Sequence, residues 1–397
     1  MIDDGGIHLS EFQSRVQKCL SEMQMKKLDL MFVYGDSNNS GNLTYLTNFR
    51  PIGVDVPGGT GHNAIFLLAK DGSATLINDR TWFLDWVKEE SWVPDIRADD
   101  QGDALGLSFE FLRKKKFLKG RIEADTRFMP APVYRSFMAN FARFEIDEQS
   151  RIVGNMRAVK SPKEIELISK SLEILGKAND AALGMAREGV SEADLAHEVR
   201  RVVMKEGADY LNSVFVHGGR RSTIALSSPT YTNYRMKKGD MVLVSAFCSY
   251  KKYYAGLDRN FVIGEASERQ KKLAEIELKT LEESIRIAKP GRLASDFLNH
   301  LYEGFAEPLL KEAGFKDYNL QGYIGHGTGV CSAEAPVLWK LDNSPLKPGT
   351  VIHIEPGMYS KDPKIGGLRT ADTILITEEG SKNLTNYPRR IGTLAQV

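Results

Sequence analysis

The chain has 397 residues, of which 42% are hydrophobic and 26% are charged, and its formal net charge is +1. This length predicts two or three domains with sizeable cores, and the composition is that of a globular protein. The near-zero charge argues against nucleic acid or a membrane surface as a partner. Three cysteines are too few for a disulfide framework, and no apolar run reaches the ~18 residues of a membrane span, so we expect a cytoplasmic protein.

The first 155 residues alternate between strand-like and helix-like segments. An amphipathic pattern predicts a helix over residues 9–27, and the apolar run that follows predicts a buried strand over residues 28–35. Residues 63–77 form two strand-like runs around Asp71-Gly72, a strong hairpin signal. This alternation predicts an α/β domain over residues 1–155.

Longer helices are expected from residue 156 onward. Ser161, Pro162 and Glu164 have the spacing of a helix start with a capping box, which predicts a helix over residues 161–189. The same reasoning predicts further helices over 191–207, 267–291 and 295–314, and strands over 239–247, 252–264, 350–357 and 368–377. Helices packed on an antiparallel sheet, an α+β layer, are therefore predicted for residues 156–397.

Several phrases, in this order and spacing, together resemble one known superfamily. They are MRAVKSPKEIELISKS, GDMVLVSAFCSYKKYYAGLDRNF, GHGTGV, LKPGTVIHIEPGMY and GGLRTADTILITEEG, preceded by LTYLTNF and AIFLLAKDGSATLI. They resemble the creatinase, prolidase and aminopeptidase P superfamily over most of the chain. The resemblance implies a creatinase/prolidase-type N-terminal domain over residues 1–155. It also implies a pita-bread catalytic domain over residues 156–397, and a homodimer.

The resemblance also locates the positions that hold metal in the peptidases of this superfamily. These enzymes bind two metal ions through two Asp, one His and two Glu, and the matching positions here are Ser245, Gly256, His326, Glu355 and Ala371. A hydroxyl, a hydrogen and a methyl group cannot replace three carboxylates that hold two cations close together. We therefore expect no two-metal peptidase mechanism, no metal ligands and no cofactor.

A second branch of the superfamily suggests what the remaining acids do. Creatinase is a metal-independent member that hydrolyses a C–N bond of a guanidino compound. Asp258 lies where creatinase keeps a substrate-binding Glu, and Glu355 matches its second acidic residue. Two carboxylates suit a planar cation. The resemblance thus predicts a metal-independent hydrolase that cleaves an amide, amidine or urea C–N bond of a small, cationic, nitrogen-rich compound.

Strand alternation brings further polar side chains to the same place. His353 and Glu355 share one face of their strand, and Arg369 shares the face of Ala371. A histidine moves protons near neutral pH, and a buried carboxylate can assist it. The predicted catalytic residues are His326, Glu355 and His353, and the predicted substrate-binding residues are Asp258, Arg369, Tyr254 and His217.

Several of these assignments have a structural alternative, and His326 could serve only to hydrogen-bond its glycine loop. His353 and His217 can be core histidines with satisfied hydrogen bonds. Glu355 can be a remnant of the superfamily site that now forms only a structural ion pair with Arg369. Asp258 can form an ion pair with the adjacent Arg259.

Two alternative functions remain open at this point. His326, His353 and Glu355 could form a two-His-one-carboxylate set for one metal ion in a hydrolase or lyase. The domain could instead be a catalytically inactive, peptidase-like binding domain. Substrate specificity is expected on the Gly- and Pro-rich stretch from Arg50 to His62.

Overall fold

The computed structural model describes residues 5–52, 62–225 and 227–389. The chain divides into an N-terminal unit, Met1–Arg157, and a C-terminal unit, Ala158–Val397. Within the described ranges, no helix combines the length and the apolar character that crossing a membrane requires. The stretch 53–61, where substrate specificity is expected, lies outside the described residues.

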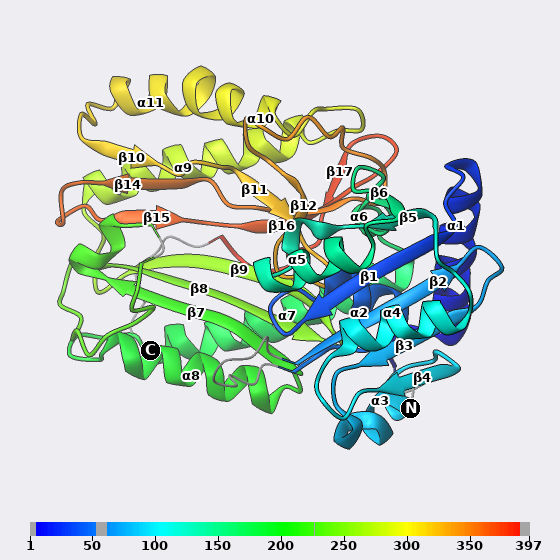
Figure 1. Cartoon of the computed structure of the whole chain (residues 1–397). Coiled ribbons are helices and arrows are strands. Elements are labelled where there is room, and N and C mark those ends of the chain that lie inside the picture. Colours follow the sequence, from blue (N-terminus) through cyan, green and yellow to red (C-terminus); the bar gives the residue numbers. More distant parts are fainter. Residues whose placement is uncertain (1–4, 53–61, 226, 390–397) are drawn as a thin grey trace. The chain divides into compact units, whose positions relative to one another are not determined.

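The N-terminal unit is one mixed sheet with helices, as predicted. Its strands follow the order β4-β3-β2-β1-β5-β6, and the pairs β3–β4, β1–β5 and β5–β6 are parallel (Figure 1). The strands are β1 (Leu30–Asp36), β2 (Asn63–Ala69), β3 (Ala74–Asn78), β4 (Asp95–Ala98), β5 (Gly120–Ala124) and β6 (Phe144–Asp147). The helices are α1 (Leu9–Met25), α2 (Gly41–Thr47), α3 (Leu84–Glu90), α4 (Ala104–Lys114), α5 (Ala131–Asn140) and α6 (Ile152–Ala158). The predicted hairpin forms, because β2 and β3 pair antiparallel around the Asp71-Gly72 turn.

In the C-terminal unit, two helices cover one face of a first antiparallel sheet. Helices α7 (Pro162–Met185) and α8 (Glu192–Lys205) pack on β7 (Tyr210–Gly218), β8 (Met241–Tyr250) and β9 (Tyr253–Val262). Helix α7 starts with the capping box that the sequence predicted, and α8 starts with a second one, formed by Ser191 and Asp194. α7 stops short of the predicted Gly189, whose backbone N–H bonds to the carbonyl of Met236 instead of continuing the helix.

The other strands of this unit form two further antiparallel sheets, of order β10-β14-β15 and β12-β11-β13-β16-β17. They are β10 (Tyr318–Leu320), β11 (Gly325–Gly327), β12 (Glu334–Val337), β13 (Val351–Ile354), β14 (Gly357–Ser360), β15 (Gly367–Arg369), β16 (Asp372–Ile376) and β17 (Ser381–Asn383). Helices α9 (Glu268–Ile287), α10 (Asp296–Leu298) and α11 (Glu307–Glu312), with a π-helical stretch at Asn299–Ala306, lie on their outer side (Figure 1). Antiparallel sheets between helical layers confirm the predicted fold class.

The strand predicted over residues 368–377 is interrupted. β15 ends at Arg369 and β16 begins at Asp372, and the two strands belong to different sheets. At the break, the backbone N–H of Thr370 donates to the buried carboxylate of Glu277 on α9. This contact bridges 93 residues of sequence, so local strand propensity could not reveal the interruption.

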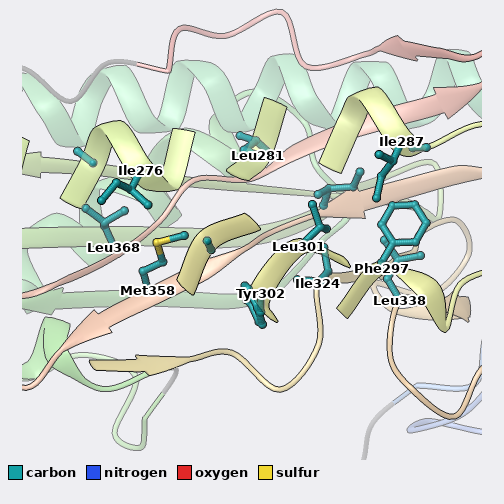
Figure 2. Packing of buried hydrophobic residues seen from close by; sticks show 14 of the residues in the cluster. Ile276, Leu281, Ile287, Phe297, Leu301, Tyr302, Ile324, Leu338, Met358 and Leu368 are labelled. Atoms are coloured by element: carbon teal, nitrogen blue, oxygen red, sulfur yellow. The ribbon is translucent and has the colours of Figure 1, made fainter. Parts of the chain in front are cut away.

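The apolar core of the C-terminal unit fixes which way the polar residues of β13 point. Ile352 and Ile354 belong to one buried cluster with Ile276 of α9, and Figure 2 shows Ile276 close to Met358 and Leu368 of the same cluster. Each fully buried side chain of this size contributes roughly 1.5–3 kcal/mol. Because side chains alternate along a strand, His353 faces away from this core. A register slip of one residue would place His353 among apolar side chains and turn the isoleucines toward the buried polar groups on the other face.

Candidate functional site

The polar site lies on the face of β8 and β9 that is turned away from α7. Ser245 of β8 pairs directly with Asp258 of β9. Cys248, which has the opposite parity to Ser245 along β8, points to α7, where its thiol contacts the carbonyl of Ser171. Strand alternation therefore places Ser245 and Asp258 on the face opposite the helix.

The guanidinium of Arg369 is the centre of this site. Its Nε lies 2.9 Å from Oδ2 of Asp258, and its Nη1 lies 3.0 Å from Oε2 of Glu355. Its Nη2 donates to Oγ of Ser245 at 2.9 Å. The backbone N–H of Arg369 donates to the side chain of Asn260, which fixes the end of β15. The arginine, both carboxylates and the serine are all buried, so these charges compensate one another away from water.

Two histidines flank the carboxylates. Nε2 of His326 is 3.4 Å from Oε1 of Glu355, and Nε2 of His353 is 3.5 Å from Oδ2 of Asp258 and 3.9 Å from Oε2 of Glu355. The pairing of β11 with β13 sets His326 opposite His353, with ring centroids 5.6 Å apart. The sequence-predicted trio of His326, Glu355 and His353 is thus brought together, along with Asp258 and Arg369.

The surrounding charges shift the pKa values of these groups. Burial alone would raise the pKa of Asp258 and of Glu355, but Arg369 and the histidines outweigh it and lower both. Burial would lower the pKa of His326, and the adjacent Glu355 carboxylate reverses this and raises it. Both carboxylates are therefore ionised near neutral pH, and the proton of His326 is held by its carboxylate partner.

The other predicted substrate-binding residues have different surroundings. The ring of Tyr254 packs edge-on against Tyr210, and its backbone carbonyl accepts a hydrogen bond from Thr328 in the glycine loop. His217 is fully buried on β7, where burial, reinforced by Arg221 and Arg369, lowers its pKa to about 4. Tyr254 thus supports the loop that carries His326, and His217 is a neutral imidazole near the Arg369 charge.

Sequence reasoning missed further side chains at the site. The ring of Phe247 lies against His353 and His326, with centroid distances of 5.1 and 6.0 Å. Tyr323 lies beside His326, and burial and the nearby Glu355 charge raise the pKa of its hydroxyl. Phe247 is two residues from Ser245, so alternation could have found it. Nothing in the local sequence marks Tyr323, because its position depends on the turn that precedes β11.

The three superfamily metal positions that lack a carboxylate do not fit a two-metal centre. The hydroxyl of Ser245 accepts from Arg369, and any side chain at Gly256 would collide with the ring of Phe247. Ala371 is buried and offers only its backbone, which bonds to the carbonyl of Asp258.

The chain is similar to known peptidases along most of its length. Residues 166–378 match the model of metallopeptidase family M24. An Xaa-Pro dipeptidase of Pyrococcus furiosus is 29% identical over 381 residues, which are 96% of this chain and 99% of that protein. An Xaa-Pro dipeptidase of Pyrococcus horikoshii is 35% identical over 255 residues, 64% of this chain and 69% of that protein. The crystal structure of the prolidase from Pyrococcus horikoshii OT3 superimposes with a TM-score of 0.77 at 27% identity, covering 95% of this chain and 99% of that one.

These similarities confirm the pita-bread superfamily and correct the predicted activity. The prediction of a metal-independent, creatinase-like hydrolase of a cationic, nitrogen-rich compound is wrong, because the matching family is one of metallopeptidases and these relatives are named Xaa-Pro dipeptidases. The structure supplies a physical reason. The two carboxylates predicted to cradle a guanidino substrate, Asp258 and Glu355, already bind the guanidinium of Arg369. The coarser prediction, a hydrolase of C–N bonds, agrees with the names, because a dipeptidase cleaves a peptide C–N bond.

Proposed function

The chain belongs to metallopeptidase family M24, and on that premise we propose that it hydrolyses the C–N bond of short peptides, foremost dipeptides of the Xaa-Pro class. The observation that carries the proposal is the pair formed by His326 and Glu355. These two residues keep their superfamily positions, and their side chains lie 3.4 Å apart. The 96% coverage of the chain by an Xaa-Pro dipeptidase supports the same substrate class.

We assign His326 as the group that hands a proton to the leaving nitrogen. The prolyl nitrogen of an Xaa-Pro bond departs as a secondary amine, so it needs a proton as the C–N bond breaks. His326 is 8% exposed, whereas His353, Asp258 and Arg369 are 0% exposed, so His326 is the group that a substrate reaches first. Its raised pKa, caused by Glu355 against the effect of burial, keeps the proton available near neutral pH.

The buried residues behind His326 hold it and its carboxylate in place. Glu355 contacts His326 with one oxygen and Arg369 with the other, so the guanidinium fixes the orientation of the carboxylate. Asp258 contacts the same guanidinium, and Nε2 of His353 lies 3.5 Å from Asp258. We therefore assign Arg369, Asp258 and His353 as positioning residues. We retain the predicted substrate-binding role for His217 and Tyr254. His217 would act as a neutral imidazole, and Tyr254 also supports the loop that carries His326.

Hydrolysis of Xaa-Pro dipeptides by the purified chain tests the proposal. The assay compares protein treated with a chelator, protein resupplied with Mn²⁺, Co²⁺ or Zn²⁺, and the His326→Ala variant under each condition. We expect release of free proline and a fall of about 10²–10⁴-fold in kcat for His326→Ala, the usual size of a general acid–base contribution. His300→Ala, a partly exposed histidine on the outer π-helical stretch, is the matched control and should keep full turnover. Proline release by no preparation, or equal turnover in His326→Ala, contradicts the proposal.

We also propose that the chain works as a homodimer, as its resemblance to the superfamily implies. Light scattering coupled to size-exclusion chromatography should give about twice the chain mass of 44.3 kDa. A mass of one chain at micromolar concentration contradicts this assembly.

A further inference from the structure

The accessible part of the site is formed by rings, and the charged groups lie behind them. Phe247 and His326 are each 8% exposed and Tyr323 is partly exposed, whereas Asp258 and Arg369 are 0% exposed. The ring centroids of Phe247 and Tyr323 lie 6.0 and 6.4 Å from that of His326. A molecule that reaches His326 is therefore in a position to contact aromatic carbon as well as the imidazole.

The ring of Phe247 has a fixed place on the site face of the sheet. Phe247 of β8 pairs with Gly256 of β9, next to the pair formed by Ser245 and Asp258. A Cβ atom at position 256 would lie less than 3.0 Å from three atoms of the ring, which is too close for carbon atoms, so the ring depends on glycine there. The ring also packs edge-on against His353, with centroids 5.1 Å apart. These contacts hold it beside both histidines.

We propose that Phe247 determines specificity for the residue on the leaving side of the scissile bond, because its ring forms an apolar wall for a prolyl ring. This inference rests on the proposed function, in which His326 gives a proton to the leaving nitrogen. In an Xaa-Pro peptide that nitrogen is part of the pyrrolidine ring, so the CH₂ groups of this ring lie beside the imidazole, where the ring of Phe247 is. In an Xaa-Ala peptide the same nitrogen carries no ring, and the contact is lost.

Hydrogen bonding acts in the same direction as apolar contact. The peptide nitrogen of proline has no N–H, so the carbon atoms of Phe247 leave no donor of the substrate unpaired. The peptide N–H of alanine needs an acceptor once it is removed from water, and the ring of Phe247 offers only carbon. A missing methylene contact in an apolar pocket changes kcat/KM by about 10–200-fold. We therefore expect this wall to favour Xaa-Pro over Xaa-Ala by about 10-fold or more.

Hydrolysis of Ala-Pro and Ala-Ala tests the role of Phe247, through the ratio of the two kcat/KM values. In Phe247→Leu, which keeps an apolar side chain without a ring, this ratio should fall by about 10-fold or more through loss of activity toward Ala-Pro. Gly256→Ala displaces the same ring without changing it and should also lower the ratio. Phe261→Leu is the matched control, because Phe261 is a buried ring of β9 that pairs with Val242 on the opposite face of the sheet. It should keep the wild-type ratio.

The outcomes separate this inference from the proposed function. An unchanged ratio in Phe247→Leu, or an equal fall in Phe261→Leu, contradicts the role of Phe247 even when the chain hydrolyses both dipeptides. If wild type hydrolyses neither, the proposed function fails, and calorimetric binding of Ala-Pro and Ala-Ala decides on Phe247 instead. Ala-Pro should then bind about 10-fold more tightly than Ala-Ala, and Phe247→Leu should remove the difference. Equal binding of the two dipeptides to wild type contradicts the inference.

Discussion

Arg259 and Arg369 are both buried in the C-terminal unit, but their partners differ. Arg259 places its N–H groups on the backbone carbonyls of Asp258, Ala371, Tyr387 and Pro388 and on the carboxylate of Asp372. Arg369 instead faces two carboxylates and a hydroxyl that share their space with two histidines. The first arginine is saturated by fixed partners and ties chain segments together. The second belongs to a cluster that includes two histidines, which can exchange protons, so burial of an arginine alone does not distinguish structure from function.

Replacing Arg259 should give the largest change in stability. Arg259→Met leaves the buried Asp372 carboxylate without one partner and frees the carbonyls at Tyr387 and Pro388. Removing one member of a buried ion pair costs about 3–5 kcal/mol of unfolding free energy, which urea unfolding measures. Arg286→Met removes the pair between the exposed Arg286 and Glu283, which keeps His300 as a partner, and should cost less than about 1 kcal/mol. Similar losses in both variants would contradict a structural role specific to Arg259.

The same comparison shows what the sequence could reveal. Adjacent residues on a strand point to opposite faces, so Asp258 and Arg259 cannot share a site, and the alternative pairing between them does not occur. Alternation likewise predicted correctly that His353 and Glu355 lie together, because the apolar residues Ile352 and Ile354 fix the register. Helix starts were also predictable, because a capping box forms between residues that are only three positions apart in the sequence.

The contacts that decide the chemistry were not predictable in this way. The guanidinium that fills the carboxylate cradle comes from a strand end 111 residues after Asp258, the difference between positions 369 and 258. The break that ends β15 there depends on Glu277 of a distant helix. A motif comparison shows which ligands are missing, but only the fold shows that Arg369 contacts both Asp258 and Glu355.

His217 provides the second test, through the pH dependence of stability. Its pKa is lowered from 6.5 to about 4 by burial first, and then by Arg221 and Arg369. Because the folded pKa lies below the unfolded one, the unfolded chain takes up the proton more readily. The contribution of His217 to stability is therefore full above about pH 6.5 and declines as the pH falls toward 4. Linkage makes this decline about 3 kcal/mol.

Urea unfolding of wild type and His217→Gln between pH 7 and pH 4 measures that decline. The variant cannot take up this proton, so the difference between wild type and variant should shrink as the pH falls. If the unfolding free energies of the two proteins changed in parallel with pH, the neutral state of His217 would not contribute to stability.

Ser245 gives the smallest and most selective test of how Arg369 is held. The hydroxyl accepts from Nη2 of Arg369 at 2.9 Å and is fully buried, so Ser245→Ala leaves one guanidinium N–H without that partner. A hydrogen bond to a charged group contributes about 1.5–3 kcal/mol, which sets the expected loss of unfolding free energy. Ser249→Ala, on the same strand, removes a hydrogen bond to the exposed carboxylate of Asp209, which water can replace, and should cost less than about 1 kcal/mol. A Ser245→Ala loss no larger than that of Ser249→Ala would mean that the carboxylates alone hold the guanidinium. A larger loss would show that the serine, at a position where the peptidases carry a carboxylate, now serves to retain the arginine.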